Sequence, residues 1–163
     1  GKLGGPCFAK GFFGVCVFVW WGKWKHILCA LFKACKNNFY NNITFYVENQ
    51  GNDVSDYWNE VKIADVIKNV DDAVRVRIYR DDEFITYAKI GTDGKPEPNT
   101  VPFVDDSTIA LQHVENFKPG DIHKYTLVLW VEGSDPECTD NILGGEFKVV
   151  MNFNSEHVDE NEK

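Results

Sequence analysis

DAVRVRIYR (72–80) and FITYAKI (84–90) are the two runs that decide the fold class of this chain. In the first run, branched apolar residues alternate with arginine and tyrosine. Because successive side chains of a strand point to opposite faces, one face of this run is expected in a hydrophobic core. Asp81 and Asp82 form the short polar connection that is typical of a hairpin. The two runs therefore predict a pair of antiparallel strands.

Further runs of strand length, rich in branched and aromatic residues, lie on both sides of this pair. They are ITFYVEN (43–49), YTLVLWVEG (125–133) and EFKVVMNF (146–153). Residues 57–70 have apolar residues at near-helical spacing, but their valines and isoleucines favour a strand with a short helical turn. Residues 91–102 are rich in glycine and proline, also contain aspartate and asparagine, and predict a loop.

At least five strands without alternating helices predict an all-β fold, an antiparallel β-sandwich of jelly-roll-like type. We expect this sandwich to form an acidic domain at residues 39–154, with a frayed charged tail at 155–163. Residues 1–38 form a basic, apolar, cysteine-rich segment. We expect this segment to be helical, with an ordinary core hairpin as the alternative.

Charge divides the chain into two parts. Residues 1–40 contain six lysines and no acid, which leaves 11 basic residues against all 25 acidic residues in 41–163. An acidic body of this kind repels the phosphates of DNA and RNA. Nucleic acid is therefore not an expected partner.

The basic segment also has the composition of a membrane-surface element. Its apolar stretch is broken near Gly22, so neither half reaches the roughly 20 residues that a spanning helix needs. Tryptophans interleaved with lysines are typical of segments that lie among lipid headgroups. The candidate membrane-contact residues are Trp20, Trp21, Trp24, Lys23 and Lys25.

Four of the five cysteines lie in the basic segment, and Cys138 lies in the acidic body. No C-x2-C pair is present, which argues against a zinc site and leaves two disulfides or four free thiols. Three pairings are open. The nested pairing, Cys7–Cys35 with Cys16–Cys29, would staple a hairpin folded near Gly22. The disulfide candidates are Cys7, Cys16, Cys29 and Cys35.

No catalytic motif is present, since the histidines and serines lack the partners that hydrolase motifs require. We therefore expect a protein that is not an enzyme and that needs no cofactor. One acidic loop, SDPECTDN (134–141), is the exception that we consider for metal binding. Calcium prefers oxygen ligands, and this loop offers Asp135, Glu137 and Asp140.

Three runs resemble exported proteins of Gram-positive bacteria of the camelysin and TasA type. They are NFKPGDIHKYTLVLWVEG (116–133), VENQG (47–51) and DAVRVRIY (72–79), and the resemblance covers about residues 43–153. It implies a jelly-roll-like sandwich, residence at the cell surface or in a biofilm matrix, and fibre assembly by strand donation. Residues 1–38 depart from the family, in which a cleavable signal leads directly into the first strand.

The sequence therefore predicts a non-catalytic extracellular or cell-surface protein that works by protein–protein contact or self-association through its sheet edges. One alternative is a membrane-associated protein whose residues 1–36 bind lipid and carry the acidic domain as soluble cargo. A weaker alternative is a calcium-binding surface module.

Overall fold

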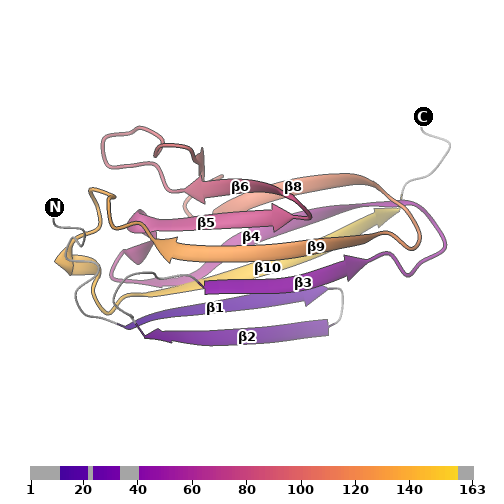
Figure 1. Ribbon diagram of the computed structural model, residues 1–163, viewed down its shortest axis with the longest axis horizontal. Helices are drawn as coiled ribbons and strands as arrows, with labels where there is room; N and C mark the ends of the chain where they lie inside the picture. Colours follow the sequence, from indigo (N-terminus) through magenta and orange to yellow (C-terminus); the bar gives the residue numbers. More distant parts are fainter. Residues whose placement is uncertain (1–11, 22–23, 34–40, 158–163) are drawn as a thin grey trace.

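The computed structural model describes the backbone of residues 12–21, 24–33 and 41–157, and the side chains of residues 42–155. Two five-stranded sheets lie face to face (Figure 1). Sheet A has the order β2-β1-β10-β4-β8, and sheet B has the order β3-β9-β5-β6-β7. The strands of sheet A are β1 (Phe12–Trp21), β2 (Trp24–Lys33), β4 (Ser55–Ile67), β8 (Thr108–Phe117) and β10 (Glu146–His157). Those of sheet B are β3 (Asn41–Glu48), β5 (Val74–Arg80), β6 (Glu83–Ala88), β7 (Val101–Pro102) and β9 (Ile122–Val131).

The predicted all-β sandwich is confirmed. The chain repeatedly crosses from one sheet to the other, and this wiring is jelly-roll-like. The exceptions are the β1–β2 hairpin in sheet A and the consecutive strands β5, β6 and β7, which all lie in sheet B. Most neighbours are antiparallel, but β1 runs parallel to β10 and β6 runs parallel to β7. No helix in the described part of the chain is long and apolar enough to cross a membrane.

The core lies between the two sheets. The alternation of β5 is confirmed, since Val74, Val76 and Ile78 are all buried. The largest fully buried side chains include Tyr57 on β4 and Tyr125 on β9. Also fully buried are Phe147, Ile109, Leu127 and Met151. Burying side chains of this size stabilises a fold by roughly 1.5–3 kcal/mol each. The packed core fixes which face of each strand is turned outward.

The predicted strands occur at residues 41–48, 74–80, 83–88, 122–131 and 146–157. Residues 57–70 are confirmed as a strand that ends in a short turn, because β4 is followed by the 3-10 turn η2 (Val70–Ala73). Strand β8 was not predicted. Three successive residues at its start are buried, and its pairing with β4 shifts register twice, so its sequence lacks the two-residue period.

The helical expectation for the basic segment is wrong. Strands β1 and β2 form an antiparallel hairpin, as the alternative proposed, and β1 lies beside β10 in sheet A. Valine, phenylalanine and tryptophan are frequent in β1 and favour strands, and the open edge of β10 provides the backbone partner. Strands from the basic segment and from the acidic body therefore share one sheet.

The predicted frayed tail also needs a correction. Residues 155–157 belong to β10 and pair with the first residues of β4, which satisfies their backbone groups. Residues 158–163 lie outside the described part of the chain.

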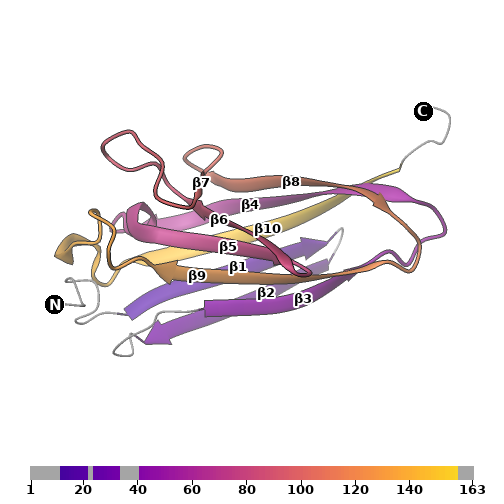
Figure 2. The ribbon, with the colours of Figure 1, turned by 45° about the horizontal axis from the view of Figure 1, so that its top comes forward.

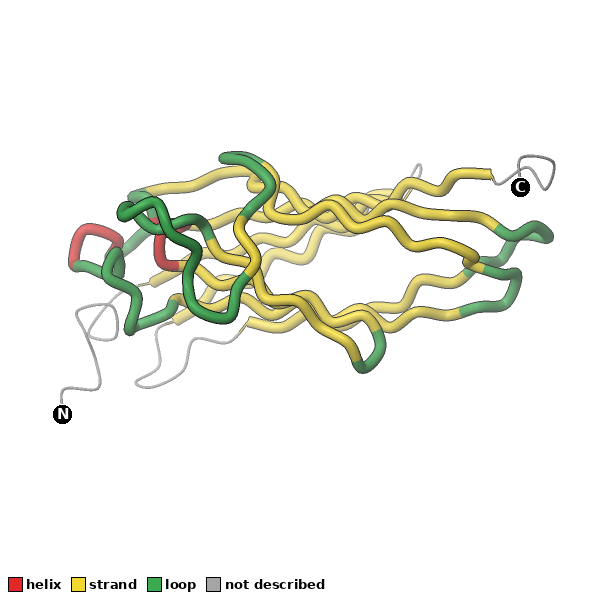
Figure 3. Tube along the Cα trace, turned by 90° about the horizontal axis from the view of Figure 1, so that it is seen from above, coloured by secondary structure: helices red, strands yellow, loops and turns green. Residues whose placement is uncertain are grey.

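Most connections lie toward the two ends of the sandwich, whereas the tight turn between β5 and β6 lies nearer its middle (Figures 2 and 3). One end carries the loop between β6 and β7 together with the loop between β9 and β10, which includes the 3-10 turn η3 (Asp140–Ile142). Thr92 in the first loop bonds to Glu137 in the second, so the two loops are in direct contact. This contact places residues far apart in the sequence in one cluster.

Candidate functional site

Arg75 is the centre of a buried charged cluster. It lies on the outer face of β5, yet the two end loops cover it and leave it buried. Its Nη1 lies 2.8 Å from Oδ2 of Asp135, and its Nη2 lies 3.3 Å from Oε2 of Glu97. We call Arg75, Glu97, Asp135 and Glu137 the Arg75 cluster. One cation from the sheet thus holds one carboxylate from each loop.

Hydrogen bonds fix the carboxylates of this cluster. The backbone N–H of Glu137 donates to Oδ1 of Asp135 at 2.9 Å, in the manner of an Asx turn. The backbone N–H and the hydroxyl of Thr92 both donate to Oε1 of Glu137 at 2.8 Å. These bonds tie the β6–β7 loop to the β9–β10 loop.

The two neighbouring carboxyl groups differ strongly in acidity. Burial raises the pKa of Asp135 to about 6, and its hydrogen bond with Glu137 adds to the rise. Hydrogen bonds from Asp135 and Thr92 hold the pKa of Glu137 at about 2. Asp135 therefore keeps its proton to a higher pH than Glu137 does. Asp135 is only 4% exposed, so solvent screens this pair weakly.

The structure brings together two of the three residues proposed for calcium. Asp135 and Glu137 lie with Glu97, and their ligand atoms are within 4.8 Å of one another. Asp140 is exposed in η3 and is not part of this group. The guanidinium of Arg75 already pairs with two of the three carboxylates, Glu97 and Asp135. Calcium binding here stays a prediction. The third carboxylate beside Asp135 and Glu137 is that of Glu97, whereas the sequence suggested Asp140.

Glu97 and Arg75 were not identified from the sequence as site residues. Glu97 lies 38 positions before Asp135, in a loop that the sequence marks only by its glycines and prolines. Arg75 follows the alternation of an exposed strand face and gives no local sign that loops cover it. Only the contact between the two loops brings these groups together.

The outer edge of β3 is an open backbone edge in the described part of the chain. All eight residues of β3 pair with β9 without a register shift, and no described strand lies on the other side. The N–H of Asn49 donates to the carbonyl of Asp121, which continues this register. Because hydrogen-bonded and non-bonded pairs alternate in an antiparallel ladder, the N–H groups of Thr44 and Tyr46 point outward.

The disulfide and membrane-contact candidates lie on or beside β1 and β2, whose side chains are outside the described set. The register puts Cys16 opposite Cys29, as the nested pairing requires. Cys7 and Cys35 lie outside the described residues. Trp21 lies opposite Trp24, Trp20 lies opposite Lys25, and Lys23 is not described.

The chain matches no known protein family, no curated protein and no solved structure. Fold and site therefore define a class only, a two-sheet all-β sandwich whose end loops are joined by a buried charged cluster. The resemblance to camelysin- and TasA-type proteins stays a prediction.

Proposed function

We propose that this protein is a non-catalytic extracellular or cell-surface β-sandwich that associates with further copies of itself through the β3 edge. The observation that carries the proposal is the regular, open edge of β3 described above. Sheet edges in monomeric proteins usually carry a bulge, a proline or an inward charge that blocks pairing. Strand β3 has no proline and no lysine, and its pairing with β9 has no bulge.

The exposed side chains of β3 favour a partner at this edge. Tyr46 is 65% exposed, and an amphipathic tyrosine ring suits an interface. The neighbouring Thr44 and Thr126 hydroxyls lie 2.9 Å apart across the strands, which keeps β3 in register with β9. An edge that is held in register is pre-organised for pairing with another strand.

We propose that Cys138 forms a disulfide, which would support an oxidising location for the protein. Cys138 is buried, and its sulfur is not a free thiol. The other cysteines of the chain are the four of the basic segment, so we propose that Cys138 pairs with one of them. Disulfides persist mainly in secreted and surface proteins.

Replacement of Tyr46 by proline tests the proposed edge. Proline removes an N–H that points outward, so it blocks strand addition while the ladder to β9 is kept. Light scattering over a range of concentrations should show that the wild type forms oligomers, whereas Tyr46→Pro stays monomeric. Tyr46→Thr is the matched control, because it removes the ring but keeps the N–H, and it should still associate.

Two results would contradict self-association through β3. The first is a wild-type protein that stays monomeric at all concentrations and shows no filaments by negative-stain microscopy. The second is an unchanged oligomer in Tyr46→Pro, which would place the interface at another surface. Circular dichroism must show that each variant is folded.

A membrane-surface role is the second candidate function. The register of β1 and β2 brings Trp20, Trp21 and Trp24 to the same end of the hairpin, next to Lys25. Tryptophan and lysine together favour binding at the headgroup region of anionic bilayers. In liposome co-sedimentation, reversal of both charges in Lys23→Glu/Lys25→Glu should reduce pelleting with anionic vesicles. Equal pelleting of variant and wild type would reject this role.

A further inference from the structure

Arg77 lies between two aromatic rings on the outer face of sheet B. Its neighbours along β5 are buried in the core, so its own side chain points away from the core. The Cζ atom lies 4.4 Å from the ring centroid of Phe84 and 5.3 Å from that of Trp130. The Nε group donates to the hydroxyl of Thr86 at 2.8 Å. The guanidinium is therefore held in one orientation by strands β5, β6 and β9.

The charge of Arg77 is not neutralised by its surroundings. Arg75, two residues earlier on the same face, has an ion pair with each of two carboxylates. Arg77 has no ion pair among the described residues, and its other hydrogen bond, at 3.4 Å, goes to the hydroxyl of Tyr79. This is notable because residues 41–163 contain 25 acidic and 11 basic residues. A fixed cation without a carboxylate can pair with an anionic ligand.

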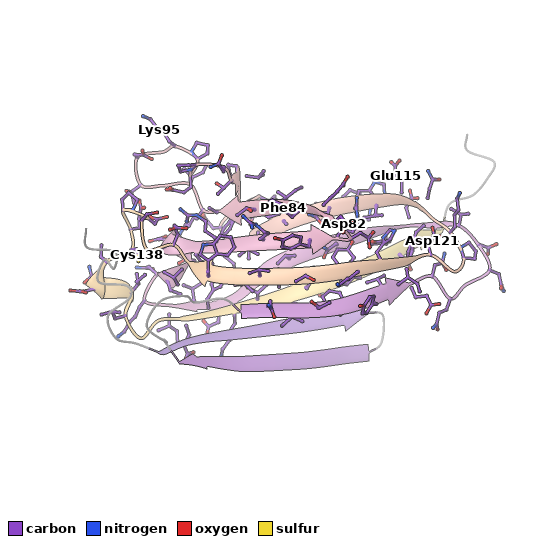
Figure 4. The ribbon with its side chains drawn as sticks, viewed as in Figure 1. Asp82, Phe84, Lys95, Glu115, Asp121 and Cys138 are labelled. Carbon is purple, nitrogen blue, oxygen red and sulfur yellow. The ribbon has the colours of Figure 1, made fainter. Side chains whose placement is uncertain are left out.

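One exposed aromatic ring and several partly or fully buried hydroxyl-bearing residues surround this cation; Thr86 is buried, whereas Tyr79 and Thr126 are partly exposed. Phe84 is 53% exposed, and its ring lies 5.1 Å from the ring of Tyr79. Figure 4 shows Phe84 on the side of the sandwich where β5 and β9 are in front. Thr126 lies opposite Tyr79 in the register and bonds to Thr44 on the next strand. The face thus offers a ring for stacking, a cation and several hydroxyls.

We propose that this face, formed by Arg77, Tyr79, Phe84, Thr86 and Trp130, binds a glycan that carries a carboxylate, such as a chain with uronic acid residues. The Nη1 and Nη2 groups of Arg77 bind the carboxylate, since Nε is already occupied by Thr86. The exposed ring of Phe84 packs against the apolar face of the sugar. This binding site is separate from the β3 edge and does not depend on self-association.

The position of Arg77 in the sheet favours a glycan over a peptide. Strands β5 and β9 each have a neighbour on both sides, so this part of sheet B has no open backbone edge for a peptide to extend. Recognition here depends on side chains alone. A pyranose ring with hydroxyls and one carboxylate matches the aromatic, hydroxyl and cationic groups that these side chains offer.

Titration of the full-length protein with oligogalacturonate, followed by calorimetry, tests the proposal. The wild type should bind this oligomer and should not bind the fully methyl-esterified oligomer, which lacks the charge. Arg77→Gln should weaken binding by about tenfold or more, as expected for the loss of a charge-assisted pair. Arg77→Lys should keep only part of the affinity, because an ammonium lacks the planar fork. Lys62→Gln, which removes an exposed cation of sheet A, is the control and should bind like the wild type.

Four outcomes would overturn the proposal. They are no binding at millimolar oligomer, equal binding of the methyl ester, unchanged binding by a folded Arg77→Gln variant, and equally tight binding of a short peptide carboxylate. Thermal unfolding shows whether the variants are folded. Light scattering on Arg77→Gln should give the wild-type oligomer, so failure of glycan binding and failure of self-association are distinguished.

Discussion

Asp135 is the residue at which burial and charge oppose each other most directly. Its pKa of about 6 lies above the value of about 3.9 for an unfolded aspartate, so the folded state binds the proton more tightly. The resulting stabilisation is present below about pH 4 and is lost as pH rises through 6. Glu137 has the opposite sign, since its pKa of about 2 gives stability that is lost as pH falls below about 4.

These pKa values predict how stability depends on pH. Between pH 4.5 and 7.5 the free energy of unfolding should fall by on the order of 2 kcal/mol because of Asp135. Asp135→Asn imitates the protonated carboxyl, so this part of the pH dependence should be absent in that variant. Urea unfolding at a series of pH values measures both proteins. A wild-type dependence that is unchanged in Asp135→Asn would show that another group titrates.

Glu137→Gln is the companion variant for this measurement. Removal of the neighbouring carboxylate takes away one cause of the raised pKa of Asp135. The pH range in which stability is lost should therefore move toward lower pH. A range that does not move would show that burial alone raises this pKa.

At the scale of elements, strands were predictable where one face is buried and the other is exposed. Strand β5 follows this rule, whereas β8 begins with Thr108, Ile109 and Ala110 buried in succession. For the hairpin of β1 and β2 the helical expectation was wrong, because the strand that pairs with β1, β10, lies about 130 positions further along the chain. Arg75 and Glu97 could not be joined by sequence reasoning, since their contact depends on how two loops fold over the sheet.

A hydrogen-bonded chain joins the two sheets at β4 and β9. The hydroxyl of Tyr57 lies 2.7 Å from the hydroxyl of Tyr125 and 2.6 Å from Nδ1 of His123. Burial raises the pKa of Tyr57, which keeps its hydroxyl protonated and able to donate. Rings of both sheets pack around it: Phe117 and Phe153 belong to sheet A, and Tyr125 belongs to sheet B. The interior of the sandwich is therefore specified by polar as well as apolar contacts.

Tyr57→Phe should destabilise the protein by roughly 1–3 kcal/mol, because it leaves two polar partners in the interior without their hydrogen bonds. Tyr125→Phe is the comparison variant, since it leaves the contact between Tyr57 and His123 in place and should cost less. Denaturant unfolding at neutral pH gives both values. Equal and negligible effects would show that water replaces the lost hydroxyl.

At the scale of the whole molecule, the fold joins segments of opposite charge. The basic segment contributes β1 and β2 to sheet A, and the acidic body contributes the other strands of that sheet. The β1–β10 pairing connects the two segments along eight register pairs. A disulfide from Cys138 to the basic segment would add a covalent connection at the loop end of the sandwich.

Non-reducing peptide mapping tests this disulfide. We expect a cross-linked peptide that joins Cys138 to one of Cys7, Cys16, Cys29 and Cys35. The cross-link would close a loop of more than 100 residues, for which chain entropy gives a stabilisation of about 4–5 kcal/mol. Reduction should therefore lower the melting temperature, and Cys138→Ser should lower it similarly and be insensitive to reductant. Five free thiols in protein from an oxidising compartment would contradict the disulfide and remove its support for an extracellular location.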